Sequence, residues 1–273
     1  MPSEIRYVDA NGLRFAYLEE GTGPLVLLLH GFPDTAHTWD RVRPLIAAKG
    51  YRVVSPWTRG YAPTAIPERD ADLETLARDA LALIPALGET SAIVIGHDWG
   101  GGAAYAAASL EPARVKKLFV VGLPHTATVR PSPLTLWKVR HFLAYKLRGA
   151  ARRFAKHDFA ALPAIYKRWS PAWSPVPDEF TAVREAFQDP ASLDAAFGYY
   201  RKLEFRPQAF LRKPIEVPTV VFAGLDDVIV KPHDYHRARR MFTGGYVVEE
   251  MRGGHFMHRE HPEQFAEKLL PHL

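Results

Sequence analysis

Apolar and polar residues alternate between residues 5 and 19, on both sides of Asn11-Gly12. A period of two is typical of half-buried strands, and Asn-Gly favours a two-residue turn, so this segment predicts a β-hairpin. Residues 25–29 and 92–96 are almost continuously apolar, and residues 115–121 end in an apolar run. Such runs indicate strands buried on both faces, as in a parallel sheet covered by helices.

Helical spacing of apolar residues follows most of these strands. The pattern predicts helices at 38–48, 73–87 and 103–110, short strands at 52–55, 219–222 and 246–249, and a closing helix at 262–270. Because strands that alternate with helices form parallel sheets through crossover connections, the chain is predicted to have an α/β fold.

The alternation stops at about residue 124 and resumes near residue 216. The intervening segment has helical character, is interrupted by prolines and is rich in Trp, Tyr and Arg. We therefore expect a helical insertion after the sixth strand. The predicted domains are a core made of residues 1–123 and 216–273 and a helical cap made of residues 124–215.

Composition excludes several classes of protein. The absence of cysteine excludes disulfides, thiol catalysis and cysteine-based metal sites. The N-terminus lacks a secretory signal and the apolar runs are too short for a membrane span, so we expect a soluble, cytoplasmic protein.

Positive charge is concentrated in one part of the chain: residues 124–214 hold 16 Lys and Arg against 7 Asp and Glu. Because these charges are dispersed without a nucleic-acid motif, we interpret them as a solvated surface and expect no nucleic-acid or membrane partner.

Two glycines frame an aspartate between the strand at 92–96 and the helix at 103–110. The segment reads Gly96-His97-Asp98-Trp99-Gly100. A sharp strand-to-helix turn needs this spacing, and it presents the central side chain above the sheet, at a helix N-terminus that stabilises negative charge. Asp98 is therefore a candidate nucleophile, although an aspartate here can also be a simple helix N-cap.

Two further candidates follow later strands. Asp226 and Asp227 come after the strand at 219–222, and His255 lies in a glycine-rich loop after the strand at 246–249. Ligands of open α/β sheets bind at the carboxyl ends of the strands, and the order nucleophile, acid, histidine is that of a hydrolase triad. Singly, the aspartates can be turn residues and the histidine a loop residue, but together they predict a triad.

In these motifs and their order, the chain resembles the α/β-hydrolase superfamily over nearly its full length. The aspartate at the elbow is similar to the branch that contains epoxide hydrolases and haloalkane and haloacetate dehalogenases. The resemblance implies an α/β-hydrolase fold: a mostly parallel eight-stranded sheet with helices on both faces and a helical cap inserted after strand 6. It also assigns the triad acid to Asp227, with Asp226 the less favoured neighbour.

The loop His30-Gly31-Phe32-Pro33 resembles the HGxP motif of this family. The resemblance implies a cis bond between Phe32 and Pro33, which aims a backbone N–H into the site. It also implies that the amides of Phe32 and Trp99 form the oxyanion hole.

The resemblance further assigns proton donors to the cap. The segment around Tyr200 resembles the motif that holds one donor tyrosine, whereas Tyr199 is expected to pack. In the segment that supplies the other donor, the usual tyrosine position falls on Phe142. We expect His141 to be that donor, with Tyr145 as its substitute, although His141 can also be an exposed cap histidine. Tyr145, Trp99 and Phe32 are expected to bind the substrate.

These roles imply an epoxide hydrolase that forms a vicinal diol through an alkyl ester on Asp98, which His255 and Asp227 hydrolyse with an activated water. Haloacetate dehalogenases typically carry arginines where this chain has Trp99 and Gly102. Haloalkane dehalogenases often carry Asn where Phe32 stands. That alternative stays open because other halide donors are present in the cap, namely Trp137, Trp169 and Trp173.

A relative that binds ligands without catalysis is a hypothesis of another class, which the complete triad disfavours. No phosphate-binding glycine loop is present, and we expect neither a cofactor nor a metal. We interpret His258 and His261 as surface residues of a helix that follows the catalytic loop. The expected ligands are an apolar epoxide or halogenated compound and water, and a homodimer is left open.

Overall fold

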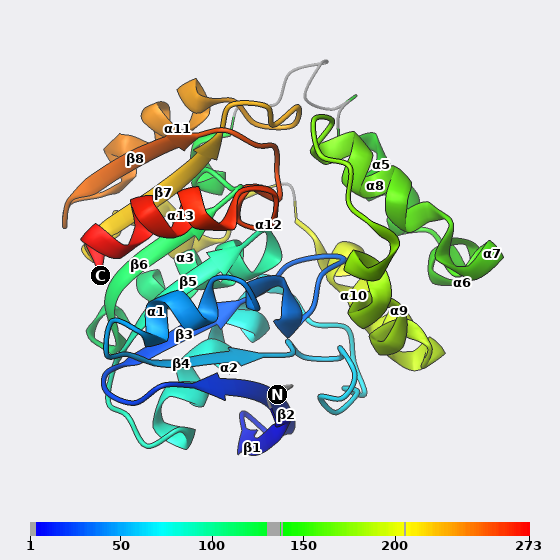
Figure 1. Cartoon of the computed structure of the whole chain (residues 1–273), viewed down its shortest axis with the longest axis horizontal. Coiled ribbons are helices and arrows are strands. Elements are labelled where there is room, and N and C mark those ends of the chain that lie inside the picture. Colours follow the sequence, from blue (N-terminus) through cyan, green and yellow to red (C-terminus); the bar gives the residue numbers. More distant parts are fainter. Residues whose placement is uncertain (1–3, 130–136, 138, 205) are drawn as a thin grey trace.

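The computed structural model describes residues 4–129, 137, 139–204 and 206–273. Its centre is an eight-stranded sheet with the order β1-β2-β4-β3-β5-β6-β7-β8 (Figure 1). The first two pairings along this order, β1 with β2 and β2 with β4, are antiparallel, and the rest are parallel. The mostly parallel sheet is therefore confirmed. The strands are β1 (Arg6–Ala10), β2 (Leu13–Glu20), β3 (Leu25–Leu29), β4 (Arg52–Pro56), β5 (Ala92–His97), β6 (Val115–Val121), β7 (Thr219–Gly224) and β8 (Tyr246–Met251).

Helices cover both faces of the sheet. Alternate residues of β3 explain why its apolar run is continuous: Leu27 and Leu29 belong to one core cluster, and Val26 and Leu28 belong to another. The first cluster contains residues of α2 (Leu73–Ala86) and α3 (Trp99–Leu110), and the second contains residues of α1 (Arg43–Ala47) and α13 (Pro262–Leu269). In Figure 1, α1 and α13 lie in front of the sheet, and α2 and α3 lie behind it. Burying each such Leu or Val contributes about 1.5–3 kcal/mol.

The described residues between β6 and β7 form helices and connecting segments, which we call the cap. The green and yellow helices at the right of Figure 1 are its main elements. Its members are η3 (Thr126–Thr128), α5 (Arg140–Tyr145), α6 (Ala150–Phe154), α7 (Lys156–Phe159), α8 (Ala161–Trp169), η4 (Pro177–Phe180), α9 (Thr181–Phe187), α10 (Pro190–Lys202) and η5 (Ala209–Arg212). The predicted domain limits, residues 1–123 and 216–273 for the core and 124–215 for the cap, stay a prediction.

Short helices complete the rest of the chain. Beyond the cap and the four helices that cover the sheet, they are η1 (Ala36–Trp39), η2 (Pro112–Arg114), α11 (Pro232–Ala238), η6 (Arg239–Met241), α12 (Met257–Glu260) and η7 (Leu270–His272). Among the described residues, no helix combines the length and the apolar character that a membrane crossing requires.

Two predicted helices differ from the structure. The single helix expected at 38–48 is divided into η1 and α1, and Pro44 lies in the first turn of α1, where its missing N–H costs nothing. The helix expected at 103–110 begins earlier, at Trp99, directly after Asp98. The three glycines of its first turn have low helix propensity, so the sequence pattern does not indicate a helix there. Close packing of these glycines on the sheet stabilises the turn.

Candidate active site

The turn between β5 and α3 presents Asp98 at the carboxyl end of the sheet. Its backbone has φ 51° and ψ −116°, a strained conformation for a residue with a side chain. A Cβ on Gly96 would lie 2.2 Å from the carbonyl oxygen of Gly100, which explains the framing glycine before the aspartate. The Asp98 side chain makes no capping hydrogen bond to α3, so it is not an ordinary N-cap.

The carboxylate of Asp98 lies between the two groups that the sequence analysis assigned to the site. Its Oδ1 accepts a hydrogen bond from the backbone N–H of Phe32 at 2.9 Å, and its Oδ2 lies 3.4 Å from Nε2 of His255. The bond between Phe32 and Pro33 is cis, as predicted. Burial would raise the pKa of Asp98, but the hydrogen bond and charge of His255 outweigh burial and lower it. The carboxylate is therefore ionised and only 14% exposed.

His255 lies between two carboxylates. Its Nδ1 is 3.3 Å from Oδ2 of Asp227, on the side away from Asp98. The other oxygen of Asp227 accepts hydrogen bonds from the amides of Ile229 and Val230, at 2.7 and 3.2 Å, which fix the carboxylate. Burial would lower the pKa of His255, but the two carboxylates raise it to about 10. The imidazole is therefore charged at neutral pH while Asp98 is free.

The neighbouring Asp226 has a different setting. Its Oδ2 accepts a hydrogen bond from the backbone N–H of Gly253 at 3.1 Å, and the residue is exposed. It thus ties two loops together, as a turn residue does, and the geometry brings Asp227, not Asp226, to His255.

The cap places aromatic rings over the nucleophile elbow. The buried ring of Tyr200 lies 5.2 Å from that of Phe32, 5.3 Å from that of Trp99 and 4.9 Å from that of Tyr145. Burial raises the pKa of Tyr200 well above its ordinary value and the pKa of Tyr145 to about 12. Both phenols therefore keep their protons at neutral pH and can donate them.

His141 is buried in the cap, so the alternative of an exposed histidine is wrong. Its ring lies 5.5 Å from Tyr145 and 5.4 Å from Trp169, and Trp169 in turn lies 5.2 Å from His255. The ring contacts thus pair Tyr200 directly with Tyr145 and place His141 beside that pair. Tyr199 packs as expected, since its hydroxyl donates a hydrogen bond to the carbonyl of Arg59 at 2.5 Å.

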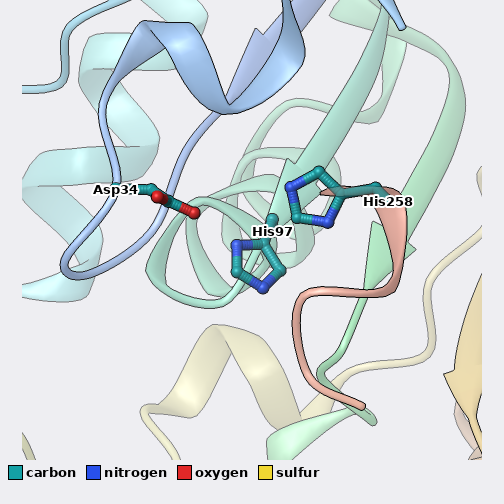
Figure 2. Close-up of side chains that lie close together, drawn as sticks. All are labelled: Asp34, His97 and His258. Atoms are coloured by element: carbon teal, nitrogen blue, oxygen red, sulfur yellow. The ribbon is translucent and has the colours of Figure 1, made fainter. Parts of the chain in front are cut away.

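A second group of polar side chains is buried beneath the elbow. Figure 2 shows His97 and His258 beside the carboxylate of Asp34, and all three residues are at most 1% exposed. The prediction that His258 lies at the surface is therefore wrong. Its ring packs 4.6 Å from Trp39 and hydrogen-bonds Thr38 Oγ1 at 2.8 Å, because the helix that carries it turns inward beneath η1. His261 is only partly exposed.

These three side chains could hold a metal by distance alone, since one possible ligand atom from each lies within 4.8 Å of the others. The surroundings oppose a cation. Both oxygens of Asp34 already accept hydrogen bonds, from Thr38 and from Tyr166, and the guanidinium of Arg259 forms an ion pair with the same carboxylate. A metal here would lie next to a buried positive charge, so we interpret Asp34 and His258 as members of an internal hydrogen-bonded network that Thr38 connects.

This network also joins the cap to the core, which the sequence analysis missed. Arg259 in α12 binds Asp34 of the core and, through Nη2, the backbone carbonyl and carboxylate of Glu179 in the cap, at 2.9 and 2.5 Å. Tyr166 in α8 donates to Asp34 at 2.5 Å. The only signal in the sequence is Asp34, the polar residue that directly follows the HGFP segment. The two partners that join it to the cap and to α12, Tyr166 and Arg259, lie more than 130 residues away.

Comparison with known proteins gives the same architecture. The family model described as alpha/beta hydrolase fold matches residues 24–262. An AB hydrolase superfamily protein of Bacillus subtilis is 30% identical over 98% of this chain and 97% of its own length. Epoxide hydrolase A of Mycobacterium tuberculosis is 27% identical, over 100% of this chain and 97% of its own.

Solved structures agree with these matches. A crystal structure from Klebsiella pneumoniae has a TM-score of 0.86 at 27% identity and covers 98% of this chain and 96% of its own. An epoxide hydrolase of Vigna radiata, 24% identical, has the same fold, with a TM-score of 0.83 over 99% of this chain and 97% of its own. The chain therefore belongs to the alpha/beta hydrolase fold family.

Proposed function

We propose that the protein hydrolyses epoxides to vicinal diols, with Asp98 as a covalent nucleophile. The observation that carries the proposal is the row of contacts from Asp98 through His255 to Asp227. The residue at the sharp turn between β5 and α3, where the nucleophile is expected, is the carboxylate Asp98. We further propose that the core residues 1–123 and 216–273 supply this triad and that the cap, residues 124–215, supplies the proton donors. The named epoxide hydrolases among the relatives support this substrate class.

In the first step, a carboxylate oxygen of Asp98 attacks a ring carbon and the carbon–oxygen bond of the epoxide breaks. The ring oxygen leaves as an alkoxide, which takes a proton from Tyr200. Tyr145 or His141 supplies the second hydrogen bond to this oxygen. The position of the buried Tyr200 ring over the elbow, 5.2 Å from that of Phe32 and 5.3 Å from that of Trp99, supports this role.

In the second step, water attacks the carbonyl carbon of the ester, and His255 accepts the proton of that water. The charges around His255 support this order of events. Its pKa is raised by Asp98 and Asp227 together, and ester formation removes the negative charge of Asp98. The imidazole of His255 then gives its proton to the deprotonated Tyr200. It is thereby neutral, and able to act as a base, when the water attacks the ester. The N–H groups of Phe32 and Trp99 stabilise the oxyanion, and collapse releases the diol.

The dehalogenase alternatives have weaker support. A halide leaves without a proton, so buried phenols would have no role in its departure. A haloacetate would need a cationic clamp next to Asp98, where Trp99 and Gly102 stand. The aromatic surroundings of Phe32, which lies within 5.2–6.3 Å of five rings, favour an apolar substrate.

The test uses the His255→Gln protein, which lacks the base but keeps the nucleophile. It is incubated separately with styrene oxide, a bromoalkane and a haloacetate, and its intact mass is recorded. We expect a gain equal to the whole mass of styrene oxide, absent in an Asp98→Asn/His255→Gln control. A gain equal to the halide substrate minus HX would replace the proposal by a dehalogenase. No adduct with any compound would favour the ligand-binding relative.

A further inference from the structure

Exposed apolar residues lie along the outer side of α5 and next to both of its ends, beside positive charge. Trp137, Leu143 and Leu147 are 63%, 55% and 60% exposed. Arg140 lies among them, with its guanidinium 3.8 Å above the centre of the Trp137 ring. We name these four residues the α5 ridge. In place of the expectation that these charges form only a solvated surface with no membrane partner, we propose that the ridge and the basic residues around it dock the protein on the surface of an anionic phospholipid membrane.

Two residues of the ridge, Leu143 and Leu147, lie on one side of a single helical segment. The amides of Lys146 and Leu147 bond to the carbonyls of Phe142 and Ala144, so helical winding continues past the end of α5. Leu143 and Leu147 are four residues apart and therefore share a side. The other side of the same segment faces the active site, since His141 is buried and the ring of Tyr145 lies against that of Phe32. The helix is therefore apolar in part on both sides, and only the side toward the active site is covered.

Positive charge is concentrated in the cap segment that carries the ridge. Residues 139–169 contain eight Lys and Arg and a single acidic residue, Asp158. Arg148, Arg152 and Arg168 are exposed, and in the described part of the chain none of them forms an ion pair. Arginines elsewhere are commonly neutralised: Arg201, for example, binds the carboxylates of Asp70 and Asp194. The charge around the ridge is therefore available to a partner.

An anionic membrane surface is the partner that satisfies both features. Leucine and tryptophan side chains can enter the boundary between headgroups and acyl chains, while arginines bind the lipid phosphates. A nucleic acid would use the arginines but would leave the leucines in water. A second copy of the chain could cover the leucines but would bring two strongly basic surfaces together. Figure 1 shows α5 to α8 in the cap, at the right of the picture and apart from the sheet.

The test is sedimentation of the whole protein with vesicles. One set is an equal mixture of phosphatidylglycerol and phosphatidylcholine, and the other is phosphatidylcholine alone. We expect binding to the anionic vesicles at low salt, at least tenfold weaker binding to the neutral ones, and loss of binding at high salt, where charges are screened. Binding that is absent, or equal for the two compositions, overturns the proposal.

Two variants locate the surface. Leu143→Ser/Leu147→Ser and Arg148→Glu/Arg152→Glu should each weaken binding to anionic vesicles at least tenfold. The matched controls are Leu45→Ser, an exposed leucine of α1, and Lys49→Glu/Lys116→Glu, a charge reversal at the opposite end of the sheet, and both should bind like the unmodified protein. Circular dichroism verifies that each variant is folded. Because the readout is binding, failure here leaves the proposed reaction untouched.

Four outcomes would contradict the proposed surface. Equal losses in the control variants would indicate general attraction by net charge. A loss with the arginine variant alone would remove the ridge from the interface. Binding to a DNA duplex instead of vesicles, or a dimer in light scattering that disappears in Leu143→Ser/Leu147→Ser, would assign the surface to another partner.

Discussion

His97 donates a hydrogen bond from Nε2 to the backbone carbonyl of His255, at 3.0 Å. A carbonyl can only accept, so the proton of His97 must be on Nε2. Burial lowers the pKa of His97 to about 4, so the ring is neutral at physiological pH. Because His97 directly precedes Asp98, one side chain joins the strand that presents the proposed nucleophile to the loop that carries the proposed base.

Removal of this link should disturb the second chemical step more than the first. In His97→Leu, the loop of His255 loses an anchor, and we expect ester hydrolysis to slow by about 10- to 100-fold, as small displacements of a catalytic group do. Single-turnover kinetics with an epoxide would separate ester formation from hydrolysis. His97→Gln keeps an N–H donor of similar reach and should recover part of the rate. Equal rates in both variants and the unmodified protein would remove His97 from the positioning of His255.

The charge of His255 should depend on Asp98. Two carboxylates raise the pKa of His255 to about 10, so replacement of one of them must lower it. We expect Asp98→Asn to bring the titration of His255 to a clearly lower pH, followed by NMR of the imidazole nitrogens. The control is Asp226→Asn, whose carboxylate binds Gly253 instead. An unchanged titration in Asp98→Asn would contradict the proposal that loss of the Asp98 charge, on ester formation, lets His255 give up its proton.

The same raised pKa links stability to pH. A histidine with a higher pKa in the folded state stabilises the fold below its ordinary pKa, and this contribution is lost as the pH rises through the folded value. For His255, this stabilising contribution is lost between about pH 6.5, its ordinary pKa, and about pH 10, its pKa in the folded protein. The unfolding free energy of the unmodified protein should therefore fall more steeply over this range than that of His255→Gln. Urea unfolding at several pH values measures the difference, and parallel curves would exclude the linkage.

Tyr200 and Tyr199 offer a matched pair for the proton donor. In Tyr200→Phe, the alkoxide loses its donor, and we expect ester formation to slow by about 10² to 10⁴-fold, with little change in ester hydrolysis. In Tyr199→Phe, the lost partner is the carbonyl of Arg59, so we expect a stability loss of about 1 kcal/mol and near-normal chemistry. Tyr145→Phe and His141→Gln then identify the second donor, since the variant with the larger slowing holds it. Equal rates for Tyr200→Phe and Tyr199→Phe would contradict the assignment.

The parts of the site that the sequence predicts are those that local spacing encodes. Glycines two residues before and after Asp98 signal the strand-to-helix turn, since a Cβ at Gly96 would meet the backbone of Gly100. Asp227 and His255 follow buried strands, and parallel strands bring their carboxyl ends to one edge. The fold follows from the same regularity, because continuous apolar runs indicate strands covered on both faces.

The parts that the sequence does not predict depend on long-range pairing. His258 occupies a short helix whose direction is set by tertiary contacts, and local pattern gives no sign that its ring packs on Trp39. Two partners of Asp34, Tyr166 in the cap and Arg259 in α12, lie more than 130 residues away. Similarly, spacing cannot decide between His141 and Tyr145, which lie one turn apart in α5 and both approach the site from the same helix.

Arg259 should be the residue whose loss most weakens the attachment of the cap. Its side chain is 10% exposed and binds Asp34, which is 1% exposed, and Glu179 of the cap. In Arg259→Met, Asp34 would keep a buried charge without its cation, and removal of one partner of a buried pair costs about 3–5 kcal/mol. The matched control is Arg78→Met, which removes an exposed pair with Glu74 and should cost at most about 0.5 kcal/mol. Urea unfolding measures both, and Asp34→Asn/Arg259→Met should recover part of the loss, because it leaves no unpaired charge. A small loss in Arg259→Met would mean that Thr38 and Tyr166 suffice to hold Asp34.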